Sequence, residues 1–276
     1  TAGIVARMRL GSISNCFSLT NVYTDNSSIK NVYEILGYNE STDVYNCYFA
    51  GSGTDALAER RTLEEFATQE MVDFLCMCIR YGVPFVVAGA TSSGKTTLLN
   101  AIMTSIPDNK RVFTIESGSR ELSLVRRGED GHIVNNAVHT LSRPSDNPAY
   151  DITQEDLVVA SLRFNPDIVC VGEMRDVECY SAVEASLTGH TVVSTVHAGP
   201  GSAAHMRIAL LCQKRFPINF QTSLMQAGQA FPIVVYSHKL ENNSRKCMDI
   251  SECIINAAGE REYNCLYNYE ITKNAI

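Results

Sequence analysis

The sequence predicts an α/β protein with a mainly parallel sheet, antiparallel strands towards the C-terminus and a partial small domain at the N-terminus. Three observations support this prediction. A glycine-rich loop stands between an apolar strand and a helix, further apolar strands alternate with helical segments, and the C-terminal part breaks into short strands separated by turns. Near-continuous Val and Ile runs alternating with helices are typical of a parallel sheet covered on both faces.

The glycine-rich loop, residues 89–97, reads GATSSGKTT and fits the pattern G-x-x-x-x-G-K-[ST]. A short apolar strand is predicted before it at 84–88, and the first turns of a helix follow at 98–103. Backbone N–H groups of such a loop cradle phosphate oxygens, helped by the positive end of the helix. In the nucleotide site predicted here, Lys95 would reach the β- and γ-phosphates and the Thr96 hydroxyl would bind Mg²⁺. The predicted nucleotide-binding residues are Gly89, Ala90, Thr91, Ser92, Ser93, Gly94, Lys95, Thr96 and Thr97.

A helix is predicted on the N-terminal side of this loop, because apolar residues there recur at helical spacing. Gly82 and Pro84 are expected to end that helix, since glycine supplies the left-handed cap and proline cannot continue a helix. Its apolar stripe consists of Leu63, Phe66, Ala67, Phe74, Leu75, Cys78 and Ile79.

The rest of the chain continues the alternation of strands and helices and ends in short strands. Further buried strands are predicted at residues 111–115, 167–172 and 191–196. Helices are predicted from Thr153 to before Pro166 and from Asp176 to Leu187, the latter ended by Gly189. The C-terminal strands are predicted at residues 233–236, 247–255 and 263–271, as an antiparallel meander.

Composition narrows the function classes. The chain has 276 residues, 45% of them hydrophobic, and a formal net charge of −7. The acidic balance argues against a general nucleic-acid clamp, which needs a basic face. No apolar run approaches the roughly 20 residues that cross a bilayer, so no transmembrane segment is predicted. Ten cysteines form neither a C-x-x-C pair nor a zinc-site spacing, so we interpret them as small buried side chains.

Three polar residues directly follow the predicted parallel strands: Glu116, Glu173 and His197. Ligands of open parallel sheets bind beyond the carboxyl ends of the strands, so the fold should bring these residues to the edge that carries the phosphate loop. A carboxylate there can orient or deprotonate an attacking water, and a histidine can sense the γ-phosphate. Taken singly, each carboxylate could equally be a helix cap and the histidine could be structural.

Four ordered stretches together resemble the secretion-ATPase superfamily of type II and type IV secretion systems, and within it the ATPases of tight-adherence (Tad) pilus and conjugation machines. They are similar to its Walker A stretch, acidic box, Walker B region and histidine box. The resemblance runs from about Leu63 to about Ile271. The four stretches are residues 89–101, 114–122, 162–175 and 188–198.

This resemblance implies a RecA-like P-loop ATPase core, residues 55–276, behind a partial N-terminal domain or linker, residues 1–54. It implies ATP and Mg²⁺ as cofactors, with Glu116 polarising or positioning the attacking water. Lys95 and His197 would be catalytic too, His197 coupling the γ-phosphate to subunit movement, and Glu173 would support Mg²⁺ and water. Arginines are suited to bidentate contacts with phosphate or with a neighbouring subunit. The candidates are Arg120, Arg163 and Arg175, each of which could equally be a solvated surface charge.

By the same resemblance the chain would form a homohexamer at the cytoplasmic face of the inner membrane, as a cytoplasmic, peripheral protein. Its partner would be an inner-membrane platform protein of a secretion or pilus machine, with no direct nucleic-acid contact. One departure stands out, because the family's acidic box reads Glu-Asp and here Ser117 follows Glu116. The family's N-terminal domain is also longer than residues 1–54, which puts ring assembly by this chain alone in question.

Three function classes stay open from the residues. The first is a motor ATPase that powers secretion, pilus assembly or conjugation. The second is a nucleotide-binding structural subunit with little turnover, which Ser117 and the short N-terminal stretch favour. The third is a RecA-like nucleic-acid motor, against which the acidic balance counts.

Overall fold

The computed structural model describes residues 66–256 and 259–269, together with the backbone of four short strands nearer the N-terminus. The chain divides into two units, Thr1–Arg61 and Thr62–Ile276. In the first unit, β1 pairs with β3 and β2 with β4, both in parallel. Leu63, predicted on the first helical stripe, lies outside the described residues. The four strands are β1 Gly11–Ser14, β2 Phe17–Ser18, β3 Thr42–Tyr45 and β4 Tyr48–Phe49.

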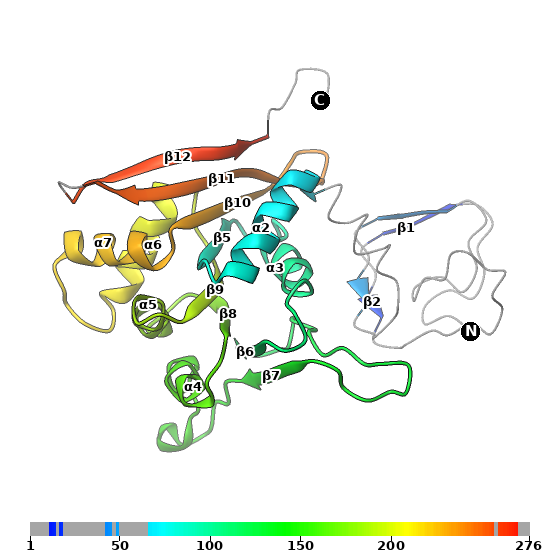
Figure 1. The fold of residues 1–276 in the computed structure, drawn as a ribbon, viewed down its shortest axis with the longest axis horizontal. Coiled ribbons are helices and arrows are strands. Elements are labelled where there is room, and N and C mark those ends of the chain that lie inside the picture. Colours follow the sequence, from blue (N-terminus) through cyan, green and yellow to red (C-terminus); the bar gives the residue numbers. More distant parts are fainter. Residues whose placement is uncertain are drawn as a thin grey trace. The chain divides into compact units, whose positions relative to one another are not determined.

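The second unit is built on an eight-stranded sheet of order β12-β11-β10-β5-β9-β8-β6-β7 (Figure 1). The six strands from β10 to β7 run parallel, and β11 and β12 are antiparallel. This confirms the predicted mainly parallel sheet with antiparallel strands towards its C-terminal end. The strands are β5 Phe85–Gly89, β6 Arg111–Glu116, β7 Asn136–Leu141, β8 Ile168–Met174, β9 Thr191–Val196, β10 Ile233–Lys239, β11 Arg245–Ile255 and β12 Arg261–Asn268.

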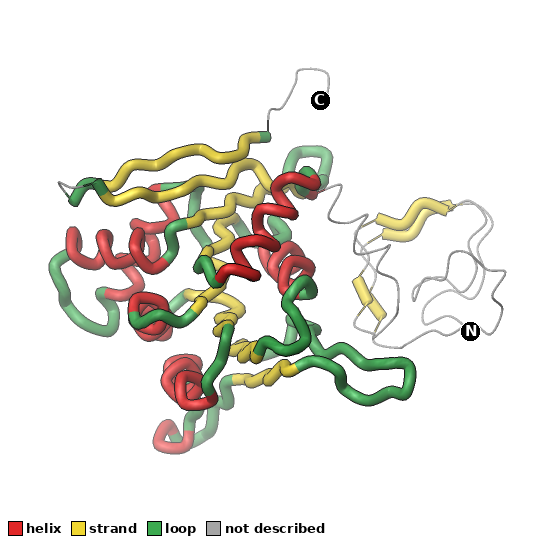
Figure 2. Tube along the Cα trace, in the orientation of Figure 1, coloured by secondary structure: helices red, strands yellow, loops and turns green. Residues whose placement is uncertain are grey.

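Helices cover both faces of this sheet (Figure 2). Alternate residues of β5 serve the two faces: Phe85 and Val87 pack with α2 and α3, whereas Val86 and Ala88 pack with α4 to α7. Burial on both sides explains the continuous Val and Ile runs of the central strands. The helices are α2 Gln69–Tyr81, α3 Lys95–Met103, α4 Gln154–Ser161, α5 Glu178–Leu187, α6 Ser202–Cys212 and α7 Phe220–Ala230, with 3-10 turns η1 Pro148–Tyr150 and η2 Leu162–Phe164.

Two predicted helices begin later than expected. The apolar stripe predicted through Phe66 and Ala67 is broken, since Thr68 caps α2 by accepting a hydrogen bond from the Met71 N–H. Helix α5 begins two residues after the predicted Asp176. Helix α3 begins at Lys95, three residues before the predicted 98, and α4 ends at Ser161, short of the predicted end before Pro166. Two other predicted boundaries hold: Gly82 ends α2 with φ +72°, and Thr153 opens α4 in a capping box.

The strand assignments need two additions. Strand β10 pairs antiparallel with β11 but parallel with β5, so it belongs to the parallel part of the sheet as well as to the predicted meander. The edge strand β7 is not predicted by the sequence, because its side chains are half-buried or exposed and carry no continuous apolar run. It pairs in parallel with β6 from Arg111 to Glu116.

Candidate nucleotide site and catalytic edge

The phosphate loop stands between the fully buried β5 and helix α3, as the sequence predicts. Gly94, which precedes α3, has φ +92°, a conformation that favours glycine, and a Cβ there would lie 2.7 Å from the Phe66 ring. Two contacts fasten the loop to the sheet. The buried hydroxyls of Ser93 and Ser237 lie 2.9 Å apart, and Arg245 Nε donates to the Ser92 carbonyl at 2.8 Å.

Lys95 is the first residue of α3 and is only 7% exposed. Its Nζ donates to the Ala90 carbonyl at 2.9 Å, which bends the side chain back over the loop, and it lies 3.5 Å from His197 Nδ1. Burial lowers the pKa of Lys95 below its ordinary value, and the carboxylates of Glu173 and Glu121 oppose this shift. Thr96 and Thr97 follow in the same first turn, half-buried.

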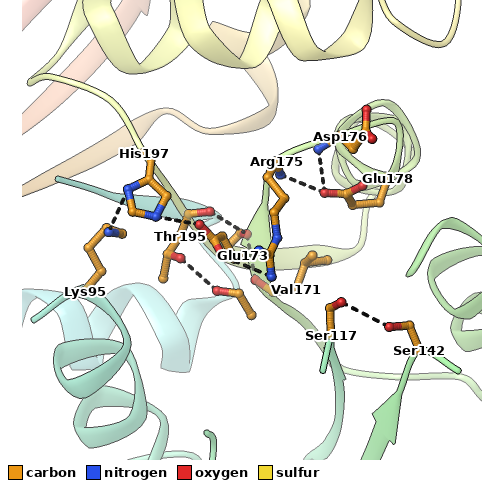
Figure 3. Close-up of polar contacts among 12 residues, drawn as sticks. Lys95, Ser117, Ser142, Val171, Glu173, Arg175, Asp176, Glu178, Thr195 and His197 are labelled. Carbon is orange, nitrogen blue, oxygen red and sulfur yellow. Dashed lines mark hydrogen bonds and ion pairs between the residues drawn. The ribbon is translucent and has the colours of Figure 1, made fainter. Parts of the chain in front are cut away.

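His197 links Lys95 to Glu173 (Figure 3). Its Nε2 lies 2.7 Å from Glu173 Oε1, and the other oxygen of that carboxylate lies 3.4 Å from the Arg175 guanidinium. A neutral imidazole protonated at Nε2 satisfies both contacts, because Nε2 then donates to the carboxylate while Nδ1 accepts from the ammonium. Burial and the Lys95 charge lower the pKa of His197, which favours this neutral form, while Glu173 acts in the opposite direction.

The strand order explains why these residues meet. Strand β9 lies between β5 and β8 in the sheet. The phosphate loop follows β5, His197 follows β9 and Glu173 lies near the end of β8, so three adjacent strands carry them. Met174 of β8 pairs with Val196 of β9, which sets the neighbouring Glu173 and His197 side by side. The expectation that parallel strand ends gather the chemistry therefore holds for Lys95, Glu173 and His197.

Glu116 lies at the end of β6 but outside this chain of contacts. The residue is 4% exposed, and its Oε1 accepts hydrogen bonds from the backbone N–H groups of Glu121 and Leu122 at 2.7 and 2.9 Å. Its Oε2 is buried without a hydrogen-bond partner. Burial raises the pKa of Glu116, although the two N–H groups and the Arg120 charge lower it.

The three candidate arginines occupy different places. Arg175 lies against Glu173, as described above. Arg120 is exposed in the loop after β6, close enough to Glu116 to lower its pKa. Arg163 belongs to η2, which leads into the amino end of β8, so it lies away from the strand ends that gather Lys95 and Glu173.

Glu121 is the charged group that the sequence does not single out. Its carboxylate, like that of Glu173, opposes the lowering of the Lys95 pKa by burial, although Glu121 and Lys95 are 26 positions apart. No local spacing signals this, because the approach depends on the fold of the loop after β6. Ser117, which stands where the family has Asp, accepts a hydrogen bond from the Ser142 hydroxyl at 3.2 Å.

Known proteins resemble this chain in sequence and in fold. Residues 62–257 match the family described as "Type II/IV secretion system protein", which is more than half of the chain. The chain belongs to this family. This secretion-system family assignment confirms the resemblance inferred from the four stretches.

Individual proteins of type IV secretion systems are also similar to this chain in sequence. The chain is 31% identical over 185 residues to the type IV secretion system protein PtlH of Bordetella pertussis, covering 64% of this chain and 52% of that protein. It is 29% identical over 150 residues to the type IV secretion system protein VirB11 of Bartonella quintana, covering 54% and 40% respectively. The chain thus spans about half the length of the curated relatives it matches or less.

A solved structure supports the RecA-like P-loop fold. The VirB11 ATPase of the Brucella suis type IV secretion system, in complex with sulphate, is similar with a TM-score of 0.56 and 24% identity. The likeness covers 73% of this chain and 59% of that one. Among the described residues, no helix combines the length and the apolar character needed to span a bilayer.

Proposed function

We propose that this chain is an ATPase that hydrolyses ATP to power a type II/IV secretion, Tad pilus assembly or conjugation machine. The observation that carries the proposal is the continuous contact chain from Lys95 through His197 to Glu173 beside the phosphate loop. Family membership supports it, since the comparable Brucella suis protein is described as an ATPase. The reaction is in-line attack of water on the γ-phosphate.

Each side chain has a separate task in this reaction. Lys95 leaves the Ala90 carbonyl and neutralises charge on the β- and γ-phosphates. Glu116 polarises or positions the attacking water, and Glu173, a quarter exposed, supports Mg²⁺ and the water. His197 holds the Glu173 carboxylate through Nε2 and is placed to report loss of the γ-phosphate to the rest of the chain. Arg175, beside Glu173, offers a guanidinium to the phosphate or to a neighbouring subunit.

Mg²⁺ fits this set of donors. Hydroxyl and carboxylate oxygens, here of Thr96 and Glu173, are the hard ligands it prefers, and in nucleotide sites it takes phosphate oxygens and waters as its other ligands. The described residues hold no group of three His, Cys, Asp or Glu that would bind a metal ion alone, which fits an ion delivered with the nucleotide. When bound, it would neutralise charge on the transferring phosphate.

We further propose that the working form is a homohexamer, placed peripherally at the cytoplasmic face of the inner membrane against a platform protein of the machine. The exposed Arg163, far from the site of its own subunit, is then a candidate for contact with a neighbour. No nucleic-acid contact is expected. The formal net charge of −7 supports this expectation.

Steady-state ATP hydrolysis with Mg²⁺, measured for the chain, Lys95→Ala and Glu173→Gln, tests the proposal. The chain should turn over ATP, Lys95→Ala should lose both binding and turnover, and Glu173→Gln should bind ATP with turnover reduced by about 10²–10⁴-fold. Turnover that survives Glu173→Gln would contradict the assigned mechanism.

A nucleotide-binding subunit with little turnover is the second candidate, favoured by Ser117. Serine has no carboxylate to contribute to the site, and the Ser117 hydroxyl accepts a hydrogen bond from Ser142. ATP binding without hydrolysis in the chain would support this candidate. Ser117→Asp should then restore measurable turnover, because it returns the second carboxylate of the family's acidic box.

A further inference from the structure

The backbone at His197 is held by strand β9 on one side and by helix α6 on the other. Val196, the last residue of β9, pairs with Met174 of β8. On the other side, residues 198–201 form a short loop of sequence AGPG, and α6 begins at Ser202. Because this loop is short, the place where α6 begins limits where the His197 side chain can lie.

A buried histidine anchors the first turns of α6. His205 is fully buried, with Nε2 2.9 Å from the Phe231 carbonyl and Nδ1 2.8 Å from the Tyr263 hydroxyl. A carbonyl oxygen can only accept, so Nε2 carries the proton and Nδ1 accepts from the tyrosine O–H. Burial lowers the pKa of His205 to about 4, so the ring is neutral at neutral pH and this assignment holds. The ring therefore joins α6 to the end of α7 and to β12.

Tyr263 lies against the loop as well as against the helix. Gly201 is the last residue of the loop, and a Cβ there would lie 3.7 Å from Tyr263 Cδ1. The rings of Tyr263 and His205 have centroids 5.6 Å apart and planes inclined by 34°. Burial raises the pKa of the Tyr263 hydroxyl, which therefore stays protonated and remains a donor at neutral pH. One side chain of β12 thus contacts the end of the loop and donates to the helix that follows it.

Both partners of His205 belong to one connected part of the sheet. Tyr263 of β12 pairs with Cys253 of β11. The Cys253 N–H donates to the Pro232 carbonyl at 2.7 Å, and Pro232 directly follows Phe231. The hydroxyl that donates to the imidazole and the carbonyl that accepts from it are therefore held relative to each other. The imidazole makes both hydrogen bonds only when α6 begins where it does.

We propose that Tyr263 and His205 are positioning residues for His197. Their hydrogen bond fixes the start of α6 and, through residues 198–201, holds the His197 imidazole between the two charged groups that it contacts. They act through His197 rather than on ATP. The effect on turnover rests on the proposed ATPase function, whereas the effect on the His197 ring does not. The competing role is packing alone, in which loss of the hydrogen bond would destabilise the fold without moving His197.

Removal of one hydroxyl tests the proposal in the full chain. Tyr263→Phe keeps the ring beside Gly201 and removes the donor to His205. We expect kcat to fall about three- to tenfold, with KM for ATP unchanged because Lys95 and the phosphate loop keep their contacts. Tyr267→Phe, on the same strand, is the matched control. Its ring packs against Phe74 of α2 with centroids 5.6 Å apart, so this variant should keep the kcat of the unaltered chain.

A double-mutant cycle with His197→Gln separates positioning from packing. If Tyr263 acts through the His197 imidazole, Tyr263→Phe should lower kcat no further once that imidazole is absent. The same fold-loss in both backgrounds would show that Tyr263 acts independently of His197 and would overturn the proposal. So would a raised KM with kcat unchanged, because the hydroxyl would then affect the binding of ATP.

NMR spectra of the imidazole nitrogens give a readout independent of turnover, with each histidine assigned from its own glutamine variant. Both His197 and His205 should carry their proton on Nε2. Tyr263→Phe should shift or broaden the His197 signals, and Tyr267→Phe should leave them in place. Unmoved His197 signals in Tyr263→Phe would overturn the proposal. A chain without turnover but with these spectral changes would refute the ATPase proposal alone.

Discussion

His197 lies between the two groups of opposite charge at the catalytic edge, with Nε2 2.7 Å from Glu173 Oε1. Its Nδ1 lies 3.5 Å from Lys95 Nζ. The ring can serve both neighbours only when neutral, since a protonated Nδ1 would face the ammonium with a second positive charge. The protonation state of one side chain therefore determines whether the lysine, the histidine and the glutamate remain connected.

Turnover should depend on this proton. Burial and Lys95 lower the pKa of His197 below its ordinary value, with Arg175 and Arg207 acting in the same direction and Glu173 against it. Because the neutral form is the connected one, kcat/KM should be complete at neutral pH and fall as pH drops through the lowered pKa, with a midpoint below 6.5. A pH profile of ATP hydrolysis between pH 5 and 8 checks this.

His197→Gln is the matched variant for that profile. Glutamine cannot take up the proton, so the variant should be slower at neutral pH and should lose the acid limb assigned to the imidazole. An acid limb of unchanged midpoint in His197→Gln would assign the titration to another group, such as Glu173.

A second histidine should make the fold sensitive to acid. His205 of α6 is fully buried, with Nδ1 2.8 Å from the Tyr263 hydroxyl and Nε2 2.9 Å from the Phe231 carbonyl. Burial lowers the pKa of His205 to about 4. The unfolded chain takes up this proton near pH 6.5 and the folded chain only near pH 4, so the stabilisation is complete above 6.5 and is lost as pH falls towards 4.

Urea unfolding at pH 7, 6 and 5 measures that loss. The free energy of unfolding should fall towards acid pH with a contribution from His205 of up to about 1.4 kcal/mol per pH unit. His205→Gln, although less stable at pH 7, should show a shallower fall. Substitution of the exposed His132 by Gln is the control and should leave the slope as it is. Equal slopes in all three chains would contradict the assignment.

The hydroxyl pair under the phosphate loop should be energetically coupled. Ser93 and Ser237 are both fully buried, and their Oγ atoms lie 2.9 Å apart. Ser237→Ala leaves the Ser93 hydroxyl without its partner, so we expect a loss of about 1–3 kcal/mol in the free energy of unfolding. In a double-mutant cycle with Ser93→Ala, the coupling should be about 0.5–3 kcal/mol. Additive losses would show that the pair contributes nothing as a pair.

The sequence predicts the catalytic edge well where local pattern and strand order suffice. Lys95 belongs to a local motif, and Glu173 and His197 follow strands whose apolar runs are unmistakable. Since β8 and β9 pair in parallel, residues at their carboxyl ends lie at the same edge of the sheet. The helical spacing of apolar residues and the capping residues also predict helix ends, such as Gly82 after α2 and Thr153 before α4.

Contacts that depend on loop paths are not predictable in this way. Glu116 is the last residue of β6 and Glu173 the last but one of β8, yet the Glu116 carboxylate turns back onto the backbone of Glu121 and Leu122. The contact between His205 of α6 and Tyr263 of β12 joins residues 58 positions apart. Strand position gives the edge on which a side chain lies, but not the direction in which the side chain points.

The last prediction concerns the glycine that opens α3. Gly94→Ala should lower both stability and nucleotide affinity, because alanine at φ +92° is strained and its Cβ would lie 2.7 Å from Phe66 Cε2. The left-handed conformation alone costs about 1–2 kcal/mol, and the contact with the ring adds to it. Gly131→Ala is the matched control, since Gly131 has φ +78° and nothing within 4 Å of the added Cβ. Thermal unfolding and ATP binding of both variants should show a smaller loss of stability and unchanged affinity in Gly131→Ala. If the two variants lose stability equally, the Phe66 ring moves away from the added methyl group without a measurable loss of stability. The prediction that the ring packs tightly against Gly94 would then be wrong.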